Sequence, residues 1–457
     1  MLIKNKKELA KTKLRKQVLE LAEAGIKSVL PRELMRKAVK YNRNKKILTI
    51  KKSMELSSEA SELSSIRIKD RIFVIGGGKA SGSMAEEIEE IIGVKNITAG
   101  IVNCKNTNYK TKKIKIHKAT HPTPSQKGVD GVEEMLSLKS KYNISKDDLI
   151  ICLISGGGSA IMPCPVDEIS LEDKQEISKL LIASGATIHE INKVRKHVSK
   201  IKGGQLGRHF APAKVISLII SDVIGDDLDV IASGPTAPDS TTFKDAYNIL
   251  KKHQLISKAP KSVLNYLKKG MQDKNLETPK GLNNCYNYII GNNRLALKTM
   301  EEKAKKLGLK PFIITDKQVG PPDIAAKARA KEILNNKYSS YNTLLIGGET
   351  TPKLPKNHGL GGRNQHYAAT TIIAMKKHSG AWAMASVGTD GSDYLQNIAG
   401  GIVDNNTLNE MKNKKINIES YLKKYDSYNL LKKISNSLIL TGETGTNVGD
   451  IMIYIFN

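Results

Sequence analysis

The feature that most constrains the fold of this chain is an apolar run that ends in a glycine-rich or Asp-containing turn and leads into a segment of helical character. The pattern occurs in Arg71–Ile75 before Gly76-Gly77-Gly78, Leu149–Ile154 before Ser155-Gly156-Gly157-Gly158, Val215–Ile220 before Ser221-Asp222, Thr343–Ile346 before Gly347-Gly348-Glu349, and Ala381–Val387 before Gly388-Thr389-Asp390. Near-continuous apolar strands that alternate with helices are typical of parallel sheets covered on both faces. We therefore expect an α/β fold whose ligands bind beyond the carboxyl ends of the strands, where these turns lie.

A polar, Lys- and Asn-rich stretch at 251–284 interrupts this pattern. We place a junction there, between an amino-terminal domain at 1–250 and a smaller carboxyl-terminal domain at 285–457. Both domains are expected to have mainly parallel sheets flanked by helices, Rossmann-like in the first, with the active-site cleft between them. Helical spacing of apolar residues from Leu14 to Lys40, interrupted at Pro31, predicts two helices with an ordinary packing face.

The net charge of the chain is strongly positive. Lys and Arg number 73 against 45 Asp and Glu, giving +28, and only 11 of the 73 are Arg. Such a balance is compatible with nucleic acid, an anionic membrane or small anionic substrates as partners. The lysines are scattered, so we interpret most of the charge as a solvated surface. A basic nucleic-acid-binding protein remains an alternative, although five Phe and one Trp give little aromatic surface for stacking bases.

Cysteine usage and hydropathy indicate the compartment. The four cysteines, Cys104, Cys152, Cys164 and Cys285, form no CxxC pair, so we expect reduced thiols in a cytoplasmic protein. No apolar run approaches the roughly 18 residues of a membrane span. We expect small-molecule partners, no specific nucleic acid, no membrane association, and a monomer or homodimer.

Two of the turns have the composition of phosphate-binding loops. Glycine lets backbone amides approach phosphate oxygens, and the dipole of a following helix favours an anion. The residues expected to bind phosphate in this way are Gly76, Gly77, Gly78, Ser155, Gly156, Gly157, Gly158 and Ser159. Neither turn is a nucleotide-binding fingerprint. In the turn at Gly76–Gly78, Ala80 follows Lys79 where a P-loop has Ser or Thr, and Ser81 stands where a dinucleotide motif has its third Gly. In the turn at Gly156–Gly158, Ile161 stands at that third position. This argues against a Rossmann dehydrogenase.

Three basic residues are candidates for binding an anion. Lys79 directly follows a glycine turn and could hold a phosphate or a transferred phosphoryl group, or it could be one more surface lysine. Arg363 opens a helical segment and offers a planar fork to a carboxylate or phosphate. Arg195 lies in Ile191–His197, a basic helical segment of which at most one or two side chains can face a site.

Carboxylates follow two of the apolar runs. The segment Ser221–Asp229 contains four Asp residues, a pattern compatible with a hard-cation site, with proton transfer or with a capped turn. Asp222 and Asp390 each come directly after a predicted strand, so both are candidates to orient a hydroxyl group or bind Mg²⁺. No side chain stands out as an activated nucleophile, and covalent catalysis is not suggested.

Taken together, these segments resemble the glycerate 2-kinase family, whose carboxyl-terminal part is the MOFRL domain. The matching segments are Gly78-Lys79-Ala80, Leu153–Ala160, Ile191–His197 with Lys202–Gly204, Ser221–Asp227 with Ile231–Thr236, Gly347–Thr351, Gly361–Gln365, Gly388–Gly391 and Thr441–Asn447. They occur in the family's order and extend over nearly the whole chain, so the resemblance is specific.

The resemblance implies ATP-dependent phosphorylation of D-glycerate at the C2 hydroxyl, giving 2-phosphoglycerate and ADP, with Mg²⁺ or another divalent cation. It places Lys79 and Arg363 at the centre of the cleft, and we expect both to be catalytic. We expect Glu349 and Asn364, in matching segments, to bind the cofactor, and Arg195 to bind the substrate. Asp222 is a further catalytic candidate, and Asp390 a further substrate-binding candidate, because both lie at strand ends. Hydroxypyruvate reductase, a label sometimes given to relatives, is the alternative enzyme, and the missing dinucleotide fingerprint counts against it.

Three positions depart from the family pattern. Asn397 stands where a carboxylate is usual, Glu443 stands where the Thr-Gly-Thr-Asn motif normally follows Pro, and Ser125 stands where the His-Pro turn usually ends in Asp. We expect these changes to affect the acceptor pocket or its metal contacts.

Overall fold

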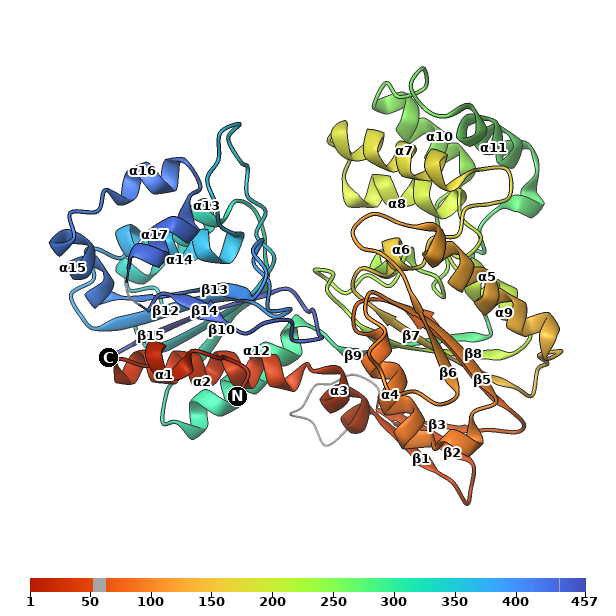
Figure 1. The fold of residues 1–457 in the computed structure, drawn as a ribbon, viewed down its shortest axis with the longest axis horizontal. Coiled ribbons are helices and arrows are strands. Elements are labelled where there is room, and N and C mark those ends of the chain that lie inside the picture. The colour runs from red at the N-terminus through yellow and green to blue at the C-terminus, as the bar shows by residue number, and fades with distance from the viewer. Residues whose placement is uncertain (52–62, 435) are drawn as a thin grey trace. The chain divides into compact units, whose positions relative to one another are not determined.

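The computed structural model describes residues 1–51, 63–434 and 436–457, which divide into two compact units (Figure 1). The amino-terminal unit begins at Leu34 and ends at Ile290. The carboxyl-terminal unit is made from residues 1–33 and 291–457. Each unit contains a six-stranded sheet with helices packed against it. The prediction of two α/β domains is therefore confirmed.

The start of the chain does not belong to the domain in which it was predicted. Residues 1–33 pack in the carboxyl-terminal unit, because helix α2 (Lys13–Ser28) contacts α12 (Asn293–Lys306) and the sheet behind it. The two helices expected between Leu14 and Lys40 are present as α2 and α3 (Pro31–Ala38). A short helix, α1 (Lys6–Leu9), precedes them.

The polar stretch at 251–284 is not a junction. It contains helix α11 (Lys261–Gln272), whose apolar residues Val263 and Leu267 are fully buried in the amino-terminal unit. Lys268 and Lys269 of this stretch lie on the solvent side of an amphipathic helix, and the boundary between the units follows Ile290.

The main sheet of the amino-terminal unit has strand order β6-β5-β4-β7-β8-β9, and β4 to β8 run parallel. Its strands are β4 (Ile72–Gly77), β5 (Ala99–Cys104), β6 (Ile114–Lys118), β7 (Leu149–Ser155), β8 (Lys214–Ile220) and β9 (Cys285–Gly291). A small antiparallel sheet precedes it, with β1 (Val39–Asn42), β2 (Ile47–Lys51) and β3 (Leu63–Arg67). The strand order reverses between β4 and β7, which is where open parallel sheets bind ligands.

Helices cover this sheet and extend beyond its strand ends. Buried side chains of α5 and α9 form one core with alternate residues of β4, β7 and β8. A second core joins α7, α8, α10 and α11 into a helical cluster, which Figure 1 shows as a separate layer past the sheet. The helices are α4 (Ser81–Ile92), α5 (Gln126–Lys141), α6 (Gly158–Ile161), α7 (Leu171–Ala183), α8 (Ile188–His197), α9 (Gln205–Phe210) and α10 (Phe243–Lys252), with single turns η1 (Val94–Asn96), η2 (Ile231–Ser233) and η3 (Lys274–Leu276).

The sheet of the carboxyl-terminal unit is mixed, which corrects the expectation of a mainly parallel sheet. Its order is β10-β11-β15-β12-β13-β14, and among its described strands only β10 and β11 pair in parallel. The last strand of the chain, β15, inserts between β11 and β12 and runs antiparallel to both. The strands are β10 (Pro311–Gln318), β11 (Thr343–Gly348), β12 (Trp382–Gly388), β13 (Ile398–Asp404), β14 (Leu438–Leu440) and β15 (Asp450–Phe456).

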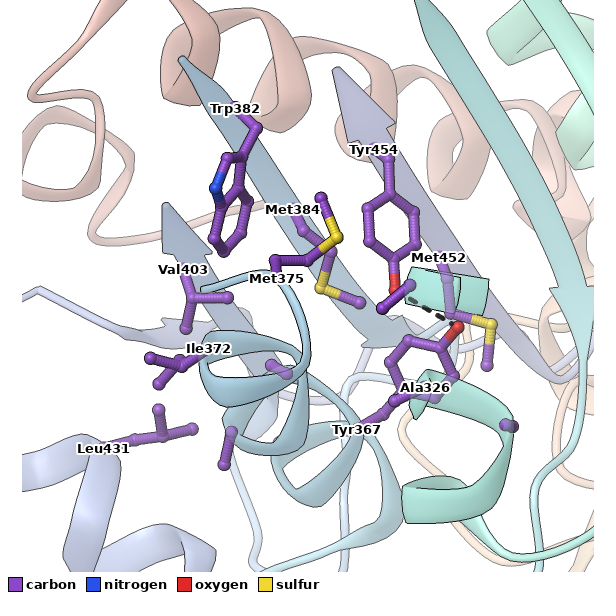
Figure 2. Packing of buried hydrophobic residues seen from close by; sticks show 14 of the residues in the cluster. Ala326, Tyr367, Ile372, Met375, Trp382, Met384, Val403, Leu431, Met452 and Tyr454 are labelled. Atoms are coloured by element: carbon purple, nitrogen blue, oxygen red, sulfur yellow. Dashed lines mark hydrogen bonds between the residues drawn. The ribbon is translucent and has the colours of Figure 1, made fainter. Parts of the chain in front are cut away.

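Apolar side chains from the sheet and α14 form the core of this unit (Figure 2). Trp382 and Met384 of β12 pack there with Met452 of β15, and the buried hydroxyls of Tyr454 and Tyr367 lie 3.3 Å apart. Helices on the sheet explain why its strands are apolar on both faces although they pair antiparallel. The helices not yet given are α13 (Pro322–Leu334), α14 (Arg363–Ala374), α15 (Asn405–Asn413), α16 (Ile418–Lys423) and α17 (Ser427–Lys433).

Two features bear on the sequence predictions about compartment. All four cysteines are unbonded thiols. None of the helices within the described ranges is both long and apolar enough to cross a bilayer.

Candidate active site

The carboxyl ends of β4, β7 and β8 bring together three of the predicted residues of the amino-terminal unit. Lys79 follows β4, the Gly156–Ser159 turn follows β7, and Asp222 follows β8. The amide of Lys79 donates to the carbonyl of Gly156, 2.9 Å away. This bond joins the two turns at the point where the strand order reverses.

Glycine is required in both turns because neighbouring atoms lie too close to leave room for a side chain. A Cβ atom on Gly156 would lie 2.0 Å from Oδ2 of Asp222, and one on Gly157 would lie 2.9 Å from His121 and 3.3 Å from Cγ of Lys79. Gly76 and Gly78 have φ of +136° and +153° and face Leu153 and Ser155 in the same way. The absence of a side chain at Gly156 and Gly157 therefore places Asp222, His121 and Lys79 around one turn.

The turn after β4 (Gly76–Lys79, the first turn) and the turn after β7 (Gly156–Ser159, the second turn) differ in the backbone amides that they can offer to a phosphate. Gly76 and Gly77 are strand residues paired with both β5 and β7, and the amide of Gly78 donates to the carbonyl of Asn103. These three residues therefore do not form the predicted cradle, because their amides serve the sheet. In the second turn, no described residue accepts a hydrogen bond from the amide of Gly157 or Ser159. Ser155 instead accepts from the amide of Ala80 and fixes the first turn.

A pocket of about 420 Å³ adjoins the second turn. It lies between the turn, the loop that begins at His121, and helices α7 and α8 of the helical cluster. Gly157 and Ser159 line it on one side, and Arg195 lines it on the other. Arg195 thus faces a cavity, as predicted for one or two residues of its segment.

The two basic residues that follow Arg195 have structural partners. Nζ of Lys196 donates to Asp229 at 2.9 Å and to Asp239 at 3.3 Å. His197 lies 2.9 Å from a carboxylate oxygen of Glu277. These contacts hold α8 against the loop after β8, and so they fix the direction in which Arg195 points.

Sequence reasoning missed three other groups at this pocket. Lys174 and Lys202 line it and are 4% and 1% exposed. Nothing distinguishes Lys174 in sequence from the other lysines of the chain, whereas Lys202 opens the Lys202–Gly204 segment that matches the family pattern. His121 stands in a His-Pro turn of the sequence, which is the one signal that could have drawn attention to it. Burial, with Lys79 and Lys105 nearby, lowers the pKa of His121 to about 4, so its ring is neutral at neutral pH.

In the carboxyl-terminal unit, Arg363 is the first residue of α14 and is held by two carboxylates. Its Nε and Nη2 donate to Asp450 at 2.6 and 3.0 Å, and its Nη1 donates to Glu349 at 2.6 Å. Burial opposes the charge of the guanidinium, but Asp450 and Glu349 outweigh it and raise the pKa of Arg363 above its ordinary value. The fork predicted to bind a carboxylate or phosphate is thus bonded to two carboxylates of the protein itself, which keep the guanidinium charged and fix its orientation.

Asp393 and Asn364 build the support around Arg363. Asp393 accepts hydrogen bonds from the amides of Asn364 and Gln365 and so satisfies the start of α14. Burial raises the pKa of Asp393 to about 6, although these hydrogen bonds oppose the rise. Asn364 is 1% exposed and bonds to Asp450, Asp393 and Ser386. Its side-chain oxygen and nitrogen therefore both have partners within the described part of the protein.

The remaining predicted positions lie in loops. Asp390 follows β12, and one of its carboxylate oxygens accepts from the amide of Ser392. Ser125 precedes α5, and its hydroxyl is buried without a hydrogen-bond partner among the described residues. Asn397 has a φ of +67°. Its carbonyl accepts from the amide of Thr441. Across the described ranges, no three His, Cys, Asp or Glu side chains come together as a metal site.

Comparisons with known proteins cover nearly the whole chain. The family profile described as "Domain of unknown function (DUF4147)" matches residues 17–268, and that of the MOFRL family matches residues 342–450. A glycerate 2-kinase of Pyrococcus horikoshii is 38% identical over 444 residues and covers 96% of both chains. A putative hydroxypyruvate reductase of Agrobacterium vitis is 36% identical over 400 residues, which cover 84% of this chain and 87% of the relative.

The fold matches a solved structure as well. The crystal structure of a glycerate kinase from Thermotoga maritima aligns with a TM-score of 0.82 and 34% identity, covering 97% of this chain and 99% of that one. Identity above 30% at this coverage shows descent and not only a shared fold. The chain belongs to the glycerate 2-kinase family.

Proposed function

We propose that this protein phosphorylates D-glycerate at the C2 hydroxyl, with ATP as the phosphoryl donor and Mg²⁺ or another divalent cation bound at the site. Family membership supports the reaction class. The observation that carries the proposal is the position of Lys79, whose side chain lies against Gly157 at the rim of a pocket lined by Arg195. This arrangement supports the proposal, because one cation lies beside the glycine turn and a second cation lines the adjoining cavity.

Phosphoryl transfer depends on positioning and on neutralising charge more than on covalent steps. Lys79 would stabilise the negative charge on the transferred group, beside the second turn. Arg363 would bind a phosphate or carboxylate with the outer edge of its guanidinium, since Asp450 and Glu349 fix its orientation. Asp222 would orient the attacking hydroxyl, and Asp390 would contact the substrate.

The acidic residues present fit a magnesium ion. Mg²⁺ is usually bound by one or two carboxylates together with water and substrate phosphates. A single Asp222 next to Gly156 meets that requirement without a cluster of three acids, and Asp390 is the second candidate. When bound, the ion would neutralise phosphate charge. Glu349 would act on the nucleotide through Arg363.

The test is release of ADP from ATP and Mg²⁺ in the presence of D-glycerate, with L-glycerate as the control. We expect ADP release that depends on the D enantiomer. Equal rates with and without D-glycerate would contradict the proposal.

Reduction of hydroxypyruvate is the second candidate, because two relatives from Agrobacterium vitis are named putative hydroxypyruvate reductases. The turn after β4 lacks a dinucleotide fingerprint, and its glycine amides are bonded within the sheet. We therefore expect no oxidation of NADH or NADPH with hydroxypyruvate. Measurable hydroxypyruvate-dependent oxidation would favour the reductase.

A further inference from the structure

We propose that Lys174 and Arg195 bind the carboxylate of the acceptor acid at the inner end of the pocket, and that Lys202 positions Ser159 beside it. The inference rests on the proposed function, because it states where the acceptor of that reaction binds. It adds Lys174 and Lys202 to the site and makes the pocket between the second turn and the helical cluster the acceptor subsite.

Lys174 carries the strongest evidence. It lies on α7 among the apolar residues of the helical cluster, and its side chain is 4% exposed. Its Nζ atom is buried and has no hydrogen-bond partner. An ammonium group is costly to bury unless it is paired. The remaining way to supply a partner for this ammonium group is a ligand bound in the cavity that the Lys174 side chain lines.

Arg195 and Lys202 converge on the same cavity without an acidic partner. No described residue forms a hydrogen bond or an ion pair with the guanidinium of Arg195. Nζ of Lys202 donates to the carbonyl and hydroxyl oxygens of Ser159, at 3.1 and 2.9 Å, and more weakly to the carbonyl of Ala232. Lys174, Arg195 and Lys202 therefore share one pocket, which the exposed Lys179 also lines, and none of the described carboxylates neutralises these three groups.

The three cations also destabilise one another. Burial and Arg195 lower the pKa of Lys174 to about 8, although the Cys164 thiol opposes the shift. Burial first, and then Lys174 and Arg195, lower the pKa of Lys202 as well. Elsewhere in the same unit buried Lys196 is paired with two aspartates. A group of cations that no carboxylate neutralises is the arrangement expected where an anionic ligand supplies the missing charge.

The lining favours a small organic acid over a nucleotide triphosphate. Pro122, Pro124, Ala160 and Ile182 provide apolar walls that suit a short carbon chain. A carboxylate at Lys174 and Arg195 lies on the same cavity as Gly157, against which the Lys79 side chain packs. The acceptor hydroxyl can then face the turn at which the phosphoryl group is held.

The proposal is tested with Lys174→Met and Arg195→Met, and Lys244→Met serves as the matched control. Lys244 is an exposed lysine of neighbouring α10, so its replacement changes the charge equally outside the pocket. Isothermal titration calorimetry on the full chain measures Kd for D-glycerate and, separately, for Mg²⁺ with a non-hydrolysable ATP analogue. We expect D-glycerate binding to weaken about ten- to a hundredfold in both pocket variants, as for loss of one charge-assisted hydrogen bond.

A stability readout separates binding from a structural role. Because Lys174 is buried without a partner, Lys174→Met should raise the melting temperature of the ligand-free protein or leave it unchanged. A lower melting temperature together with unchanged D-glycerate affinity would show that Lys174 is a structural residue and overturn the proposal. Lys174→Gln is the second variant if Lys174→Met does not fold.

The outcomes distinguish this inference from the proposed function. If the wild type phosphorylates D-glycerate but both pocket variants keep its Kd and KM, the acceptor binds elsewhere and only the inference fails. If the ATP analogue loses affinity while D-glycerate does not, the pocket binds nucleotide phosphate and the inference fails. If the wild type does not phosphorylate D-glycerate, the function fails, and titration with lactate and inorganic phosphate decides whether the pocket binds a carboxylate.

Discussion

Arg363 and Asp450 form a two-bond ion pair, with Nε 2.6 Å from Oδ2 and Nη2 3.0 Å from Oδ1. The two residues are 87 positions apart, at the start of α14 and the start of β15. Asp450 is fully buried, whereas part of the guanidinium is exposed. The pair therefore ties the last strand of the chain to the arginine that we propose binds an anion.

Replacing Asp450 by Asn should destabilise the protein and reduce activity. The change leaves a buried end of Arg363 without its charge partner, and we expect a loss of about 2–4 kcal/mol in the free energy of unfolding. Urea denaturation measures it. Glu349→Gln is the matched control, because its side chain is 41% exposed and its ion pair should contribute less than about 1 kcal/mol. Equal losses in the two variants would contradict this account of the pair.

Replacing Gly156 by Ala should lower kcat at least tenfold, whereas the free energy of unfolding should change little. The new Cβ would lie 2.0 Å from Oδ2 of Asp222 and force that carboxylate away from the turn. Gly281→Ala is the control, because no atom lies within 4 Å of its Cβ position. Steady-state kinetics with ATP and D-glycerate measures the effect. A wild-type kcat in Gly156→Ala would show that the position of Asp222 is not needed.

His121 should make the protein less stable as the pH falls from about 6.5 toward 4. The folded protein holds the pKa of His121 near 4, below its ordinary value of 6.5, through burial and the nearby Lys79 and Lys105. In this window the unfolded chain binds more protons than the folded protein, so stability decreases as the pH falls. Melting temperatures from pH 4 to 7 should therefore decline less in His121→Gln than in the wild type.

The exposed residue His358 supplies the control for that titration. His358→Gln should follow the wild-type melting curve at every pH. A His121→Gln protein with the same pH dependence as wild type would contradict the burial argument.

Lys79→Met and Arg363→Lys should each lower kcat by about 100-fold or more, the range for loss of a preorganised charge in the transition state. Arg363→Lys keeps the positive charge but removes the planar guanidinium that bonds Asp450 and Glu349. Lys95→Met, at an exposed lysine of the same unit as Lys79, should keep the wild-type rate. Rates measured under saturating substrates give kcat directly, and full activity of Lys79→Met would remove Lys79 from the mechanism.

The strands and their turns could be predicted from local sequence, because an apolar run that ends in glycine forms a strand and a turn through residues that are close together in the chain. All five predicted runs are strands, and the turns after β4, β7 and β8 meet as expected for parallel neighbours. The antiparallel insertion of β15 was not predictable in the same way. A strand buried on both faces is apolar whichever way its neighbours run, and the pairing of β15 with β11 is a contact between distant segments.

Lys174, Asp450 and the placement of residues 1–33 were not predicted, also because they depend on contacts between distant segments. Lys174 matters because its Nζ is buried and unpaired, and burial depends on the packing of α7 against other helices. Asp450 carried one usable signal, since it opens the apolar run that becomes β15 just as Asp390 closes the run that becomes β12. Residues 1–33 were assigned to the wrong domain because an amphipathic helix does not reveal which sheet it covers.

The most direct test of the central claim is the identity of the product. Purified protein is incubated with ATP, Mg²⁺ and D-glycerate, and the phosphorylated acid is identified by ³¹P NMR against authentic 2- and 3-phosphoglycerate. The account predicts 2-phosphoglycerate and an equal amount of ADP, both greatly reduced with Lys79→Met. Formation of 3-phosphoglycerate, or ADP without any phosphoglycerate, would contradict it.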